Sequence, residues 1–134
     1  MFAERLNASQ RQAVFDLGVM LAYADQELAE EEAQYLKAFS ERFDIAYDLE
    51  KNHLDMDTCL QVFKTRAERI ILLQELIKLS YKDGHFGHEE QEKVFAIAQK
   101  LGLNEPELFM RIEKWVREGF NWAHEGEAML EDNG

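Results

Sequence analysis

The sequence predicts an all-α protein, and three observations carry that prediction. Apolar residues recur at spacings of three and four along most of the chain, and no segment alternates convincingly with a period of two. Only one of the 134 residues is proline and 46% are hydrophobic, which is typical of a folded helical chain. A helix–turn–helix pattern also occurs twice, 58 positions apart. We therefore expect a compact bundle of about seven helices, built from two helix–turn–helix repeats related by an approximate twofold axis.

The two copies of the repeat are most alike at residues 21–32 and 79–90. They read LAYADQELAEEE and LSYKDGHFGHEE, with leucine, tyrosine, aspartate and two glutamates in register. With their flanking helices, the repeats are expected to cover about residues 8–54 and 66–118 of a single domain, 1–124.

The first half of the chain carries signals for four helices. Asn7, with Gln10 three residues later, has the pattern of a capping box and predicts a helix that ends near residue 25. The glutamates at 30–32 favour a second helix start, because acidic side chains interact well with a helix N-terminus. A short helix is expected within residues 44–53, and another is expected to open at residues 57–58.

The second half carries signals for three longer helices. Thr65 and Glu68 match a second capping box before the most apolar segment of the chain, 70–80, which predicts a central buried helix. This helix is expected to stop near Gly84, and the next at Gly102, since glycine readily adopts the left-handed conformation at helix ends.

The last long helix is expected to start at a third box. Residues 104–107 read Asn-Glu-Pro-Glu, and proline is tolerated in a first helical turn. After His124 the chain is small and acidic, and residues 125–134 are expected to fray.

The charge balance limits the classes of partner. Acidic residues number 27 against 15 basic ones, for a net charge of −12, which disfavours nucleic acid and favours cations and basic proteins. No apolar run approaches the roughly 18 residues of a membrane span, so no membrane insertion is expected. A start without a signal peptide and a single cysteine, Cys59, favour a cytoplasmic protein, with Cys59 a small core residue.

The repeated acidic turn resembles the TerB-like (tellurite resistance) family. The residues that carry the resemblance are 21–32 and 79–90, with the sequence AQKLGL that ends at Leu103, and the similarity covers about residues 8–118. The resemblance implies a compact helical domain with no catalytic constellation, a role in the response to tellurite or other stress, and acidic clusters that bind divalent cations. Ala29 and Gly87 depart from the family's serine or threonine, and Gln26 departs from its glycine.

The acidic turns have two interpretations. Asp25 with Glu32, and Asp83 with Glu90, would supply the carboxylates that Ca²⁺ or Mg²⁺ prefers. Alternatively, the aspartates accept hydrogen bonds from free amides of the following helix, and the glutamates favour its N-terminus. An EF-hand is excluded because the twelfth position of each loop, counted with the aspartate as the first, is apolar: Leu36 and Val94.

Two histidine patterns point to other metals. His85 and His88 flank the second turn, where they would join Asp83 and Glu90 around a transition metal such as zinc, giving a metalloenzyme. Glu50 and His53 match half of a di-iron motif, but no second Glu-x-x-His occurs.

Aromatic residues of the last helix provide a further candidate surface. Trp115 and Trp122 lie seven residues apart on one helical face, and Trp122 and Phe120, if exposed, would mark a docking surface. Our leading hypothesis is a non-enzymatic TerB-like domain that acts through protein contacts and a divalent cation. An acidic module that binds a basic partner without metal is the second hypothesis, and the metalloenzyme is the third.

Overall fold

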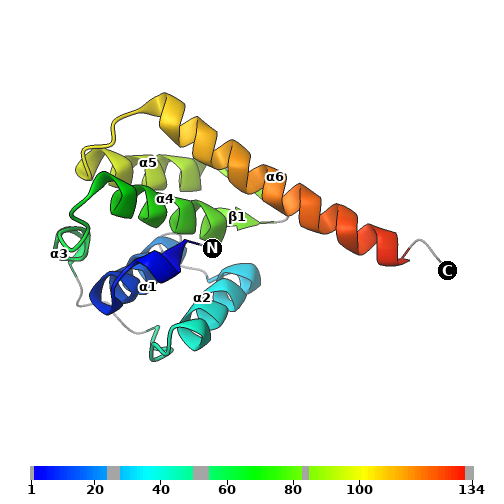
Figure 1. Ribbon diagram of the computed structural model, residues 1–134, viewed down its shortest axis with the longest axis horizontal. Helices are drawn as coiled ribbons and strands as arrows, with labels where there is room; N and C mark the ends of the chain where they lie inside the picture. The colour runs from blue at the N-terminus through cyan, green and yellow to red at the C-terminus, as the bar shows by residue number, and fades with distance from the viewer. Residues whose placement is uncertain (1, 24–27, 50–54, 83–84, 132–134) are drawn as a thin grey trace.

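The structure is a computed structural model that describes residues 2–23, 28–49, 55–82 and 85–131 (Figure 1). Within these ranges the fold is helical except for one pair of two-residue strands, so the all-α prediction is confirmed. Six α-helices and a single-turn 3-10 helix are present there, in place of about seven helices. The elements are η1 (Ala3–Arg5), α1 (Ala8–Ala22), α2 (Glu30–Arg42), α3 (Met56–Leu60), α4 (Arg66–Ser80), β1 (Tyr81–Lys82), β2 (His85–Phe86), α5 (His88–Lys100) and α6 (Pro106–Glu131).

Two of the three predicted capping boxes are present. The Gln10 N–H donates to Asn7 Oδ1 at 2.8 Å, and the Asn7 N–H donates to the Gln10 side chain at 3.0 Å. Thr65 and Glu68 exchange the corresponding bonds at 3.1 and 3.0 Å. The third prediction is wrong, because α6 begins at Pro106 directly after Glu105, one residue later than a cap at position 104 requires.

The boundaries of the helices repeat with the spacing seen in the sequence. Helices α1 and α4 start and end 58 residues apart, and so do α2 and α5. The helix ends match as well. Asp44 and Gly102 both have positive φ, 55° and 78°, and the next N–H donates to a carbonyl five residues back, from Ile45 to Ser40 and from Leu103 to Ala98, each at 2.8 Å. Both ends are therefore Schellman motifs. The twofold relation between the two hairpins stays a prediction.

Helix α4 occupies the centre of the molecule. It packs against α1, α2, α5 and α6, and Figure 1 shows it between α1 and α2 on one side and α5 and α6 on the other. Four of its apolar side chains are essentially inaccessible to solvent, Leu72, Leu73, Leu76 and Ile77. Burial on several sides explains why segment 70–80 is apolar around most of its circumference, as the sequence predicts.

Close approach of α1 to its neighbours depends on Gly18. A Cβ at this position would lie 3.0 Å from a methyl of Leu36 in α2 and 3.2 Å from a methyl of Leu79 in α4. Both distances are tighter than ordinary van der Waals contact, so a larger residue would require the two leucine side chains to shift.

Two further expectations are corrected. Residues 44–49 are not helical, because Asp44 adopts the left-handed conformation and ends α2, while 50–53 lie outside the described residues. Residues 125–131, expected to fray, form the last turns of α6. Tyr81 is buried, whereas its counterpart in the first repeat, Tyr23, is 40% exposed. Cys59 is buried, in agreement with its predicted place in the core.

The two Schellman motifs generate a prediction about stability. Asp44→Gly removes the cost of a left-handed side-chain-bearing residue and should raise the free energy of unfolding by about 1 kcal/mol, whereas Gly102→Ala should lower it by about 1 kcal/mol. Urea denaturation of both variants measures the two changes. Equal effects of the same sign would contradict the assignment of matching helix ends.

Candidate functional site

The first acidic turn uses its described glutamate as a helix cap. Glu32 is buried in the first turn of α2, and its carboxylate accepts a hydrogen bond from the Ala29 N–H at 3.0 Å. Ala29 has no side-chain acceptor, so Glu32 provides only the reciprocal half of a capping box. This geometry favours capping over cation binding for Glu32, while Asp25 lies outside the described residues.

The second turn shows the same arrangement in part. A Cβ added at Gly87 would overlap the Glu90 carboxylate, so this side chain folds back over the residue before α5, as Glu32 does before α2. Glycine at position 87 leaves room for that carboxylate. Asp83 lies outside the described residues, as does the side chain of His85. His88 is exposed and pairs with Glu92 at 3.0 Å.

No metal centre emerges from the part of the chain that the structure describes. There, no three side chains of His, Cys, Asp or Glu gather closely enough to hold an ion. The structure thus brings Glu32 and Glu90 to helix N-termini, and no described side chains complete a ligand set around either. Binding of Ca²⁺ or Mg²⁺ at the acidic turns, and of zinc at His85 and His88, stays a prediction.

A buried polar group connects α2 to the central helix. Tyr35 of α2 donates its hydroxyl hydrogen bond to Glu75 of α4, and the Lys78 ammonium lies 3.0 Å from the same carboxylate. Glu75 is only 3% exposed. A carboxylate with so little solvent needs such partners, because an uncompensated buried charge costs about 3–5 kcal/mol. Burial raises the pKa of Tyr35 well above its ordinary value, and the negative charge of Glu75 adds to that shift.

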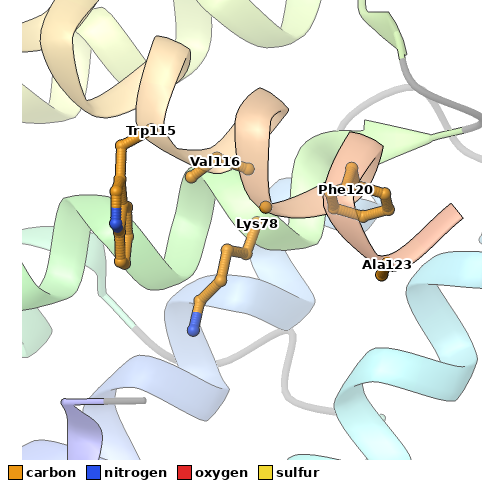
Figure 2. A pocket seen from close by; sticks show the side chains of 6 residues that line it. Lys78, Trp115, Val116, Phe120 and Ala123 are labelled. Atoms are coloured by element: carbon orange, nitrogen blue, oxygen red, sulfur yellow. The ribbon is translucent and has the colours of Figure 1, made fainter. Parts of the chain in front are cut away.

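Lys78 also borders an apolar groove between α4 and α6. The groove has a volume of about 320 Å³. Figure 2 shows Trp115 at one end, Phe120 and Ala123 at the other, and the Lys78 ammonium pointing away from α6. Because this ammonium pairs with Glu75, Lys78 offers the groove mainly its methylene stem. The residues that line the groove are Lys78, Trp115, Val116, Gly119, Phe120 and Ala123.

Helix α6 extends well beyond the helix on which it packs. It has 26 residues and α4 has 15, or about 39 and about 22 Å at 1.5 Å per residue. Figure 1 shows its second half projecting from the bundle towards the C-terminus. Tyr81, directly after α4, still packs against Phe120 with ring centroids 4.9 Å apart. Every residue from 121 to 131 is exposed.

The exposed half of α6 continues the apolar pattern of the buried half. Residues spaced alternately four and three apart lie along one line on a helix surface, as in a coiled coil. In α6 this line begins with the buried Ile112 and Val116. Trp122 and Met129 follow Trp115 at seven-residue intervals and lie beside this line. Trp122 is 80% exposed, and Leu130, on the line itself, is 83% exposed. We define the α6 seam as Ile112, Val116, Gly119, Ala123, Gly126 and Leu130.

Comparisons with protein-family models, curated proteins and solved structures find no match to this chain. The resemblance to the TerB-like family therefore stays a prediction carried by residues 21–32 and 79–90. In the described residues, no helix is both long and apolar enough to cross a membrane.

Sequence reasoning identified part of this site and missed the rest. The spacing of Trp115 and Trp122 indicated a common face. The condition set for a docking surface is met in part, because Trp122 is exposed whereas Phe120 is partly buried and packs on Tyr81. The role of Tyr35 and Glu75 was missed. One signal was present: Glu75 interrupts the most apolar segment at the place where the first repeat has Leu17.

The polar group generates a pH prediction. A raised native pKa means that stabilisation by Tyr35 is complete below about pH 10, its unfolded pKa, and declines as the pH rises towards the native value. Tyr35→Phe should lower the free energy of unfolding at pH 7 by about 1–3 kcal/mol through loss of a bond to a charged group. Urea denaturation from pH 7 to 11 should show this deficit shrinking above pH 10. Titration of Tyr81 affects the unsubstituted protein and Tyr35→Phe alike, so it cancels in the difference between them. A difference in unfolding free energy that stays constant from pH 7 to 11 would contradict the assignment.

The acidic turn generates a second prediction. Glu32→Ala removes the bond to the Ala29 N–H and should destabilise the protein by about 1–2 kcal/mol, whereas Glu32→Gln keeps an acceptor and should cost less. Thermal unfolding with and without millimolar Ca²⁺ or Mg²⁺ separates capping from cation binding. A cation-dependent rise in Tm that both variants lose would show that Glu32 is a ligand.

Proposed function

We propose that this protein is a non-enzymatic protein-interaction domain that binds a helical segment of another protein along the second half of α6. One observation carries the proposal: the α6 seam runs on past the end of α4 with its apolar face uncovered. Helix α4 covers Ile112 and Val116, and a second helix lying along the same line would cover the remainder.

The groove supports a helical occupant. It opens where α4 ends, so a partner helix that follows the seam would place an apolar side chain between Trp115 and Phe120. Large aromatic side chains around such a pocket are typical of the residues that dominate binding energy at interfaces. The apolar lining of this groove favours binding over chemistry as the function.

The resemblance to the TerB-like family adds a biological setting to this proposal. A stress-response role, including tellurite resistance, is what the resemblance implies. Cytoplasmic action on a protein partner is a separate part of the proposal. Cation binding at Asp25, Glu32, Asp83 and Glu90 would be a separate property, because these turns precede α2 and α5 and not α6.

Site-specific photo-crosslinking tests the proposed surface. A photoreactive residue at Leu130 should give a discrete adduct with another protein in the source cells, and Trp122→Ala in the same chain should reduce it at least tenfold. A photoreactive residue at Met110, equally part of α6 and 67% exposed but on the opposite side from the seam, is the matched control. Equal adducts from both positions, or none from Leu130, would contradict the proposal.

A further inference from the structure

We infer that the helix bound by α6 is cationic: an amphipathic segment with aliphatic side chains on one face and lysine or arginine beside them. This inference rests on the proposed function and adds the chemical class of the partner. The interaction surface is an apolar seam with glutamates along one border and Trp122 on the other.

The charged side chains beside the uncovered part of the seam, Glu127 and Glu131, are both acidic. Glu125 and Glu118, which pairs with Lys114 at 3.9 Å, lie farther round α6, and residues 118–131 contain no lysine or arginine. The nearest basic side chain before them, Arg117, is held by Glu113 through bonds of 2.7 and 2.8 Å. A partner helix would therefore meet a negative rim. Complementary charge speeds association and selects against partners of the same sign.

The shape of the seam favours a close helical neighbour. No atom lies within 4 Å of a Cβ placed on Gly119 or Gly126, so both positions are open at the surface. With Ala123 between them, they form a shallow floor on which leucine-sized side chains of a partner would rest. Trp122 beside this floor adds an aromatic face that attracts a lysine or arginine side chain by cation–π interaction.

A second copy of this chain is the competing occupant, and charge opposes it. Each molecule has a net charge of −12, and two overlapping α6 ends would bring their glutamates together without a basic residue from 118 onward to neutralise them. Like charges across an interface cost several kcal/mol. The same repulsion acts against anionic helices.

A pair of synthetic peptides tests the inference. One is an 18-residue amphipathic helix of leucine and lysine, and the other has glutamate in place of every lysine. By fluorescence anisotropy, the full-length protein should bind the lysine peptide at least tenfold more tightly than the glutamate peptide. Affinity should fall as salt rises from about 50 to 500 mM, since the rim charges are screened.

Variants locate the binding. Trp122→Ala and Glu127→Lys should each weaken the lysine peptide at least fivefold, while Met110→Ala should leave its affinity unchanged. Trp122 and Met110 are both exposed, so neither truncation is expected to unfold the domain, and circular dichroism checks this.

The possible failures are distinct. Equal affinity for both peptides with continued dependence on Trp122, or binding of neither peptide, would overturn the cationic partner and leave the proposed function to the crosslinking result. Binding of the lysine peptide that ignores Trp122→Ala would overturn the α6 surface itself. Concentration-dependent dimerisation that Trp122→Ala abolishes, seen by sedimentation, would identify a second copy as the occupant and overturn the inference.

Discussion

Burial of α4 on several sides is the constraint on which the rest of the structure depends. Its inaccessible leucines and Ile77 require neighbours on each side, and α1, α2, α5 and α6 supply them. Fully burying one such side chain contributes about 1.5–3 kcal/mol. The same constraint makes Glu75 costly, and its bonds to Tyr35 and Lys78 offset that cost. The position of Lys78 at the groove therefore follows from the core, because its ammonium is directed by a buried carboxylate.

Much of this fold could be predicted from local signals. The capping boxes at Asn7 and Thr65 and the apolar run of α4 each follow from short-range physics, and the structure has them as expected. The segment after α2 was predicted less well, since a short helix was expected within residues 44–53. Asp44 adopts the left-handed conformation there, which a glycine such as Gly102 signals clearly and an aspartate only weakly. The fraying predicted after His124 was wrong because glycine and acidic content outweighed a seven-residue apolar pattern that continues to Leu130.

The candidate site was harder to predict than the fold. Pairing of Tyr35 with Glu75 joins residues 40 positions apart, and no local pattern indicates which buried carboxylate will meet which hydroxyl. The spacing of the tryptophans was visible, but whether Trp122 is covered depends on where α4 ends relative to α6. For the acidic turns, the sequence allowed both capping and cation binding, and the contact between Glu32 and Ala29 favours the first for that residue.

The unsupported length of α6 has a consequence for its own rigidity. An isolated helix of about a dozen residues is marginal in water, so the last three turns depend on continuity with the turns that pack on α4. Unwinding them backward from Glu131 exposes none of the core, and such local opening is inexpensive. A ligand bound there would have to order the end of α6, and the cost of that ordering would weaken its binding. We therefore expect a bound partner to dissociate rapidly, which suits reversible contacts.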